Sequence, residues 1–363
     1  MKVKELVSEL ERFAPSSLQE SYDNAGLNVG FPDAEINGVL ICIDIIPEVV
    51  DEAIAKGCNM IVSHHPLIFP NIKRITGNNN VEKSIIKALQ NNISIYCGHT
   101  NFDKAQNGVS MKMCEKLGLK NCTVLDSERD MLRKIAVYVP QQHAEIVRNA
   151  MFSAGAGTIG NYDECSFNVN GTGTFRADEN CNPFVGEIGE QHHEAEVRIE
   201  VICPSYLQAK VVSAMLKVHP YEEPAFDIYQ IENQWEQVGL GAIGELAEEI
   251  TENELLETVK QTFKVGNIRH SAKTGRKIRR VAVCGGSGAS YIRTAIASNA
   301  DAYITADIKY HDWFLAEGKI LLLDIGHHES EQFTKEIFYD IIAKNNGCKA
   351  YLSDINTNPI NNY

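Results

Sequence analysis

The sequence predicts an α/β protein in which one α/β domain is interrupted by a smaller domain of the ferredoxin-like type. Short apolar strands alternate with amphipathic helices over residues 38–125, and the same alternation returns over residues 279–345. The stretch between them follows a different order of strands and helices. We therefore expect an outer domain at residues 1–128 and 236–363, with residues 129–235 inserted between its halves.

Each half of the outer domain is expected to form a mostly parallel sheet covered by helices, because its strands are short and wholly apolar. The first half has expected strands at residues 38–44, 59–63 and 93–98, and expected helices at residues 47–57, 79–92 and 107–119. Pro47 opens the first of these helices and Gly57 closes it. The second half has expected strands at residues 279–284, 302–306 and 319–326, each followed by a helix, the last from about Glu329.

The middle of the chain has the order βαββαβ, which is typical of a ferredoxin-like domain with its own core. Its strands are expected at residues 134–140, 165–176, 196–203 and 225–232, and its helices at residues 143–155 and 206–219. The segment "QIENQWEQ" (230–237) is expected to be a linker that returns the chain to the outer domain.

Composition and charge favour a globular protein of the cytoplasm. The 363 residues are 44% hydrophobic and 23% charged, and no apolar run approaches the ~20 residues that span a bilayer, so no membrane contact is expected. Residues 1–13 alternate charged and apolar side chains at helical spacing, which predicts a helix rather than a signal peptide. The net charge of -14 disfavours nucleic-acid binding, and we interpret the basic segment 274–283 as the solvated start of a strand.

Ten cysteines are present, but their spacing fits neither a disulfide framework nor a zinc knuckle. No two are closer than Cys114 and Cys122, so the chain has no C-x-x-C motif. Several lie inside apolar strands, as Cys42 and Cys284 do. We expect buried free thiols and a reducing compartment.

The stretch "IVSHHPLIF" places two adjacent histidines, His64 and His65, at the end of an apolar strand. Neighbouring side chains of a strand point to opposite faces, so both imidazoles can face one point only if the strand ends at Ser63 and the chain turns. Functional residues of such sheets gather at the carboxyl ends of the strands. The next strand is followed by His99 and Asp103, which we therefore expect nearby.

A third strand end, in "DIGHHESEQF", supplies His327 and Glu331, which are four positions apart and so share one face of a helix. Imidazoles and carboxylates without thiolates suit zinc, iron, manganese or nickel rather than a structural zinc cage. There are more candidate ligands than one tetrahedral site can hold, and a carboxylate can bridge two ions. Two metal ions ~3.5–4 Å apart are therefore plausible. The candidate ligands are His64, His65, Asp103, His327 and Glu331.

Other interpretations of these residues stay open on the residues alone. Either histidine pair could lie on the surface or cap a helix, and Asp103 could cap the helix beside it. Glu331 could be a solvated residue in the first turn of a helix. Because three clusters follow three strand ends, we favour the metal site.

Three further motifs have alternative interpretations. "HHEAE" (192–196) leads into a strand of the inserted domain, and we expect it on the surface. "CGGSGAS" (284–290) could receive an anion at a helix N-terminus, but it lacks the P-loop pattern, and a tight turn is the simpler interpretation. His311 in "TADIKYHD" could line the metal cleft as a proton donor or have no role there.

The motifs together resemble those of the GTP cyclohydrolase I type 2 homologue family, the Ngg-interacting-factor-like dinuclear metal proteins. The segments that carry the resemblance span nearly the whole chain and are, in order, "ESYDNAGLNVG", "PEVVDEAIAKG", "IVSHHPLIF", "GHTNFD", "GAGTIGNYDECSF", "GTGTFR", "HPYEEPAFDIY", "TADIKYHD" and "GHHESE". The chain is similar to the long bacterial form, in which a PII- or CutA-like domain interrupts the metal-binding domain. Two positions depart from the family pattern, which has Trp in place of Tyr22 and Gly in place of Ala306.

The resemblance implies that the candidate ligands bind two divalent metal ions (zinc, iron or manganese), that Glu331 bridges them, and that the protein forms a toroidal homohexamer. It also implies opening of the guanine imidazole ring of GTP, with release of formate. In that chemistry a metal-bound hydroxide would attack C8 of the purine, and His99 or His311 would move protons.

A family name does not fix an activity, so three hypotheses stand side by side. The first is a metal-dependent hydrolase acting on a nucleotide-like small molecule such as GTP. The second is a non-enzymatic metal-handling or regulatory protein that acts through its inserted domain. The third is phosphoester hydrolysis at the same two metals, which would release phosphate rather than formate.

Overall fold

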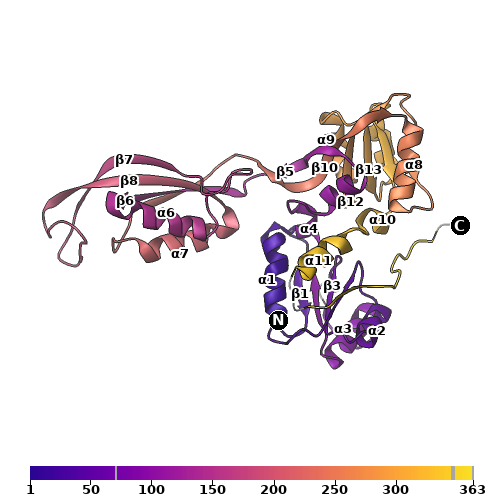
Figure 1. Ribbon diagram of the computed structural model, residues 1–363, viewed down its shortest axis with the longest axis horizontal. Coiled ribbons are helices and arrows are strands. Elements are labelled where there is room, and N and C mark those ends of the chain that lie inside the picture. The colour runs from indigo at the N-terminus through magenta and orange to yellow at the C-terminus, as the bar shows by residue number, and fades with distance from the viewer. Residues whose placement is uncertain (70–71, 345–347, 362–363) are drawn as a thin grey trace. The chain divides into compact units, whose positions relative to one another are not determined.

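A computed structural model of the protein describes residues 1–69, 72–344 and 348–361. The chain divides into two compact units (Figure 1). The outer unit comprises Met1–Ser127 and Gln237–Tyr363, and the inserted unit comprises Glu128–Glu236. No helix among the described residues has the length and apolar character needed to cross a membrane.

The first half of the outer unit supplies four strands of a five-stranded sheet with the order β1-β4-β3-β2-β15, and the second half supplies β15. Its strands are β1 (Gly26–Val29), β2 (Val39–Cys42), β3 (Met60–Ser63), β4 (Ser94–Cys97) and β15 (Ala350–Leu352). Strands β15, β2, β3 and β4 run parallel, and β1 pairs antiparallel with β4. The mostly parallel sheet expected from the apolar strands is confirmed.

Helices cover both faces of this sheet. They are α1 (Val3–Phe13), α2 (Pro47–Ala55), α3 (Asn80–Gln90) and α11 (Thr334–Ala343), with α4 (Thr100–Lys104) following β4. Alternate strand residues serve separate cores, because Ile41 packs with α1 and α11 whereas Leu40 packs with α2 and α3. Helix α11 comes from the second half of the chain, so both halves contribute to this core (Figure 1).

The second half supplies most of a six-stranded sheet with the order β11-β14-β13-β12-β10-β5, and β5 comes from the first half. Its strands are β5 (Lys120–Glu128), β10 (Trp235–Ile250), β11 (Arg269–His270), β12 (Ile278–Ser287), β13 (Ala302–Ala306) and β14 (Leu321–Asp324). Strands β12, β13 and β14 are parallel. One core contains side chains of α5 (Val109–Lys116) and α8 (Glu252–Phe263), and the other contains side chains of α9 (Ile292–Ala297) and of the 3-10 segment η5 (Tyr310–Ala316).

Four expectations for the second half need correction. Its sheet is parallel only in β12–β14, because β10 pairs antiparallel with β12 and β11 pairs antiparallel with β14. The segment after β13 is the 3-10 segment η5 rather than an α-helix. Strand β10 was not expected, and it begins at Trp235, so only residues 231–234 of the expected linker lie outside strands. The helix expected from about Glu329 begins earlier, as α10 (His327–Glu331), and is followed by α11.

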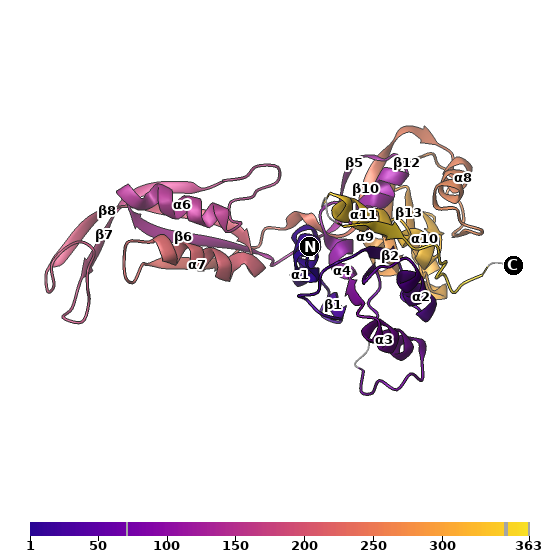
Figure 2. The same cartoon turned by 60° about the horizontal axis from the view of Figure 1, so that its bottom comes forward.

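The inserted unit has the βαββαβ element order expected from the sequence. Its elements are β6 (Leu132–Pro140), α6 (Ala144–Ser153), β7 (Phe167–Arg176), β8 (Gln191–Pro204), α7 (Gln208–Val218) and β9 (Phe226–Gln230). The strands form an antiparallel sheet in the order β7-β8-β6-β9. Helices α6 and α7 pack together on this sheet around a core of its own (Figure 2).

All ten cysteines are free thiols, and six of them, Cys42 and Cys284 among them, are buried. This confirms that the cysteines inside the apolar strands act as small core residues rather than disulfide partners.

Candidate metal centre

Strand β3 ends at Ser63, and the chain bends at His64 and His65. The Ser63 hydroxyl donates to the His65 carbonyl over 2.9 Å, and the His65 amide donates to the Ile43 carbonyl over 2.9 Å. These bonds hold the turn, and the two imidazole rings lie 5.0 Å apart. The sequence-based expectation that the strand stops here, so that both rings face the same region, is confirmed.

Helix α10 places His327 and Glu331 on one face. His327 is its first residue, and the distance from its Nε2 to Glu331 Oε2 is 3.2 Å. Glu331 is buried, and its two oxygens face different histidines. Oε2 lies 2.9 Å from His65 Nε2, and Oε1 lies 3.5 Å from His64 Nε2.

Three groups of side chains have ligand atoms within 4.8 Å of one another and could each hold a metal ion. They are His64–His65–His99, His65–His327–Glu331 and His64–Asp103–Glu331. Every candidate ligand from the sequence belongs to at least one group, and His99, expected as a proton carrier, joins them. Glu331 is shared by two groups, so one carboxylate lies beside two potential ion positions.

Three buried polar atoms in this cluster fit a cation. His64 Nε2, Asp103 Oδ1 and Glu331 Oε2 have no hydrogen-bond partner among the described residues. The first two lie 3.8 Å apart. Leaving buried polar atoms unpaired costs free energy, and native structures rarely do so without a reason such as an ion. The donor set of imidazole nitrogens and carboxylate oxygens suits a divalent transition metal.

A second layer of acceptors orients the imidazoles. Three aspartates each place a carboxylate oxygen 2.7 Å from the Nδ1 of a ring: Asp44 at His65, Asp23 at His99 and Asp307 at His327. The Gly98 carbonyl does the same for His64 at 2.9 Å. With Nδ1 engaged in this way, Nε2 of each ring is left for the centre, an arrangement typical of metal-binding histidines.

The sequence-based prediction missed these three aspartates. Asp307 comes directly after β13 and Asp44 comes two residues after β2, at strand ends where functional residues gather, so their positions carried a usable signal. Asp307 also has φ +56, a left-handed conformation that aspartate tolerates better than most residues. Asp23 lies in an irregular segment before β1, and nothing local in the sequence indicates its contact with His99.

The carboxylates set the protonation of the imidazoles. Burial lowers the pKa of His65, but its bonds to Asp44 and Glu331 outweigh burial and raise that pKa to about 10. For His327 burial is likewise outweighed, by Glu331 and Asp307, and its pKa rises to about 9. Burial raises the pKa of Asp103, whereas the histidines around Glu331 overcome burial and hold the pKa of Glu331 well below its usual range. In the absence of a metal, protons on these side chains therefore supply part of the positive charge that a metal ion would bring.

The glycine-rich segment "CGGSGAS" is part of the wall of this centre. A Cβ atom at Gly286, where φ is +64, would lie 2.3 Å from Glu331 Oε1 and 3.3 Å from His327 Cε1. The Gly286 amide donates to the Ser330 hydroxyl over 2.9 Å. The tight turn therefore lets the backbone approach the shared carboxylate closely.

Two other histidine motifs lie outside the three groups. His311 is exposed, and its ring contacts those of Tyr310 and Phe314. The "HHEAE" histidines lie in β8, where His192 bonds to Glu194 over 2.8 Å and His193 is exposed. His311 as a proton donor stays a prediction.

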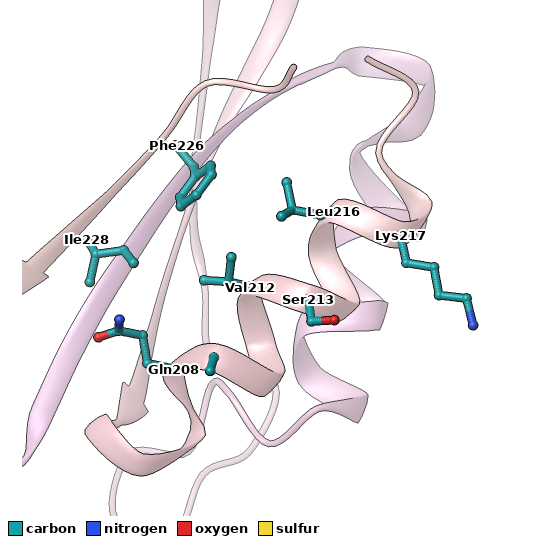
Figure 3. Close-up of a pocket in the computed structure, with 8 residues that line it drawn as sticks. Gln208, Val212, Ser213, Leu216, Lys217, Phe226 and Ile228 are labelled. Carbon is teal, nitrogen blue, oxygen red and sulfur yellow. The ribbon is translucent and has the colours of Figure 1, made fainter. Parts of the chain in front are cut away.

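The inserted unit contains a cavity of about 680 Å³ between α7 and β9 (Figure 3). Val212, Leu216, Phe226 and Ile228 form much of its lining, with Lys217 at the rim. In the described part of the chain its lining contains no histidine or carboxylate, so its chemistry differs from that of the metal centre.

Comparison with known proteins places this geometry in a family. The proteins named GTP cyclohydrolase 1 type 2 homolog from Halalkalibacterium halodurans and Bacillus subtilis are 41% and 36% identical to this chain. The alignments cover 83% of this chain and 81% of the first relative, and 98% of this chain and 97% of the second.

A crystal structure of a Bacillus cereus protein related to NIF3 superposes with a TM-score of 0.87 at 39% identity, covering 100% of this chain and 99% of the other. The family model for Duf34/NIF3 (NGG1p interacting factor 3) matches residues 1–359. The chain belongs to the Duf34/NIF3 family.

Proposed function

We propose that the protein binds two divalent metal ions in this centre and uses them to hydrolyse a nucleotide-like small molecule. The observation that carries the proposal is the shared position of Glu331 between two groups of potential ligands. His64 and Asp103 would hold one ion, His65 and His327 would hold the other, and Glu331 would bridge them.

The metal is zinc, iron or manganese in this proposal, because imidazole and carboxylate ligands accept all three. When bound, such ions supply Lewis-acid chemistry and lower the pKa of coordinated water. The buried carboxylates and the second layer of aspartates would fix the ligands in place and keep their Nε2 atoms available.

His99 is our candidate for proton transfer. Hydrogen bonds from the His99 ring and from Thr100 outweigh burial and lower the pKa of Asp23 to about 2, so Asp23 stays ionised beside the ring. This carboxylate holds His99 at Nδ1, and Nε2 can then exchange a proton with a reacting atom at the centre. His311 is the second candidate, through its place after β13.

GTP is the first substrate to test, because the relatives carry the name GTP cyclohydrolase 1 type 2 homolog. An aromatic surface beside the centre suits a planar base. The Phe69 ring lies 6.0 Å from the His99 ring and 6.5 Å from the ring of Tyr22. Phe69 is 49% exposed and Tyr22 is 65% exposed. Such side chains can stack on a nucleobase.

Metal analysis tests the binding part of the proposal. Protein purified without added metal and then loaded with zinc should contain two ions per chain, and a His327→Ala variant should keep one. His193→Ala, an exposed histidine of the inserted unit, is the matched control and should keep both. Wild-type protein without bound metal would refute the proposal.

Product analysis tests the catalytic part. Metal-loaded protein at saturating GTP should release formate above the level of a His64→Ala variant. Release of phosphate instead would favour phosphoester hydrolysis at the same centre. If neither formate nor phosphate exceeds the level of the His64→Ala variant, GTP hydrolysis is excluded. A metal-handling role then stands, provided that the protein binds its metal ions.

The oligomeric state belongs to the same proposal. A homohexamer is our expectation, and light scattering of the full chain measures it directly. A monomer or dimer at micromolar concentration would contradict that part without affecting the metal centre.

A further inference from the structure

The C-terminal segment 353–358, which we call the C-terminal strap, runs from strand β15 to the metal centre. It starts beside β2, where the Ser353 amide donates to the Ile41 carbonyl over 2.8 Å. Glu52 of α2 then accepts from the Ser353 hydroxyl over 2.5 Å and from the Asp354 amide over 2.9 Å. The start of the strap is therefore fixed to the first half of the outer unit.

Thr357 reaches a ligand of the centre through one carboxylate. Its hydroxyl donates to Asp44 Oδ2 over 2.7 Å, while Asp44 Oδ1 lies 2.7 Å from His65 Nδ1. The two contacts use different oxygens of the same group, so the hydroxyl restrains the plane of the carboxylate that orients the His65 ring.

Asn358 reaches the other side of the centre. Its Nδ2 donates to Glu329 Oε1 over 2.9 Å, and Glu329 lies on α10 between His327 and Glu331. Adjacent residues of the strap therefore hold ligand-bearing elements from the two halves of the chain.

Polar contacts rather than apolar burial hold the far end of the strap. Thr357 and Asn358 are half-buried, whereas Asp354, Ile355 and Asn356 are exposed. Simple packing of a chain terminus would bury apolar side chains, yet here the two residues in contact with Asp44 and Glu329 are the ones that are covered.

We propose that Thr357 and Asn358 are positioning residues of the metal centre, which hold the His65 side and the α10 side at the separation that two ions require. This inference rests on the proposed metal binding. It assigns to the C-terminal strap a role in affinity for the ions.

Titration of the full-length, metal-free protein with Co²⁺ tests the inference, because the visible absorption of bound Co²⁺ reports both affinity and ligand geometry. Thr357→Val removes the hydroxyl and keeps the shape of the side chain. It should weaken binding of one Co²⁺ about 10-fold, the usual effect of losing a group behind a ligand, and should change the spectrum of that ion. Thr357→Ser keeps the hydroxyl and should restore both.

Two matched controls separate positioning from general stability. Thr251→Val removes the hydroxyl that caps α8 in the same unit and should lower thermal stability without changing the Co²⁺ titration. Asn358→Ala should weaken binding as Thr357→Val does, whereas Ile360→Ala, at an exposed position of the same tail, should not.

The outcomes distinguish this inference from the proposed function. Wild-type affinity and spectrum in Thr357→Val would overturn the inference and leave the metal centre intact, as would equal losses in Thr251→Val and Thr357→Val. A wild-type protein that binds no Co²⁺ would instead refute the proposed function, and the inference would fall with it.

Discussion

The outer and inserted units each bury a glutamate, and the two glutamates differ in what surrounds them. Glu196 of the inserted unit accepts a hydrogen bond from the Tyr221 hydroxyl over 2.9 Å and packs on Gly173. Glu331 of the outer unit faces three imidazoles, and its Oε2, His64 Nε2 and Asp103 Oδ1 have no hydrogen-bond partner among the described residues. The contrast shows that several unpaired buried ligand atoms gathered at one point, rather than a buried polar residue as such, indicate a ligand site.

Two buried histidines repeat the contrast. Both ring nitrogens of His219 in the inserted unit are bonded, Nε2 to the Tyr138 carbonyl over 3.0 Å and Nδ1 to the Tyr221 amide over 3.1 Å. His64 in the outer unit is bonded only at Nδ1 within the described structure, and its Nε2 faces Asp103 and Glu331. His219 is therefore a satisfied core residue, whereas His64 has a free ligand atom.

Strand direction accounts for much of this difference. Parallel strands end at the same edge of a sheet, so β2, β3 and β4 deliver Asp44, His64, His65 and His99 to one region. The four strands of the inserted unit are antiparallel, so their carboxyl ends alternate between opposite edges.

Exchange of each buried glutamate for glutamine gives the largest expected contrast. Glu331→Gln removes the charge shared by two groups, so both ions should be lost in metal analysis. Glu196→Gln should leave the metal content unchanged and lower the stability of the inserted unit by about 1 kcal/mol, through a weaker bond to Tyr221. Equal metal content in the two variants would remove the distinction between the units.

Added methyl groups at two glycines should give the next largest effect. Gly286→Ala would place a Cβ against Glu331 Oε1 and hold alanine at φ +64, which costs about 1–2 kcal/mol. Metal affinity should fall at least about 10-fold. Gly171→Ala in β7 has open space for the methyl group and is the control. Calorimetric titration with zinc measures both, and unchanged affinity in Gly286→Ala would contradict the close approach of this turn to the carboxylate.

Metal binding should release protons at pH 7. His65 and His327, with pKa values of about 10 and about 9, carry protons there in the metal-free protein, and a metal must displace them. Because these pKa values are raised, the displaced protons become fewer as pH rises, and apparent affinity should increase about 10-fold per pH unit for each proton between pH 6 and 9. Titrations in buffers of different ionisation enthalpy count the protons. A pH-independent affinity would contradict this charge distribution.

The smallest expected effect is on the inserted unit, where the pKa of a buried histidine is shifted in the opposite direction, downward. Burial lowers the pKa of His219, so the folded unit prefers the neutral ring. The stability that this provides is present above the ordinary pKa of about 6.5 and falls as pH drops below it, by at most about 1.4 kcal/mol per pH unit.

Hydrogen exchange of the β6 amides between pH 7 and pH 5, corrected for intrinsic rates, measures this loss. A His219→Gln variant is the control, because it removes the titration and should show a flatter response. An identical pH response in the variant would show that another group is responsible.

Patterns with a short range made much of the structure predictable. The apolar strands, the βαββαβ order and the i, i+4 spacing of His327 and Glu331 depend on neighbouring residues, and each is confirmed. Strand ends also indicated where His64, His65 and Asp103 would meet residues from a distant segment.

Features that depend on distant contacts could not be predicted in this way. Asp23 contacts His99 across 76 positions, and Thr357 contacts Asp44 across 313. The segment at η5 was expected to be a helix but forms a 3-10 segment, in which Trp313, Leu315 and Ala316 pack on the core beside β13 and β14. Patterns among neighbouring residues do not indicate contacts between residues far apart in the chain.

Anomalous diffraction from crystals of metal-loaded protein, at wavelengths on both sides of the metal edge, tests the central claim most directly. Our account predicts two peaks per chain on either side of the Glu331 carboxylate, one beside His64 and Asp103 and the other beside His65 and His327. No peak near Glu331 in fully loaded protein, or peaks only in the inserted unit, would contradict it.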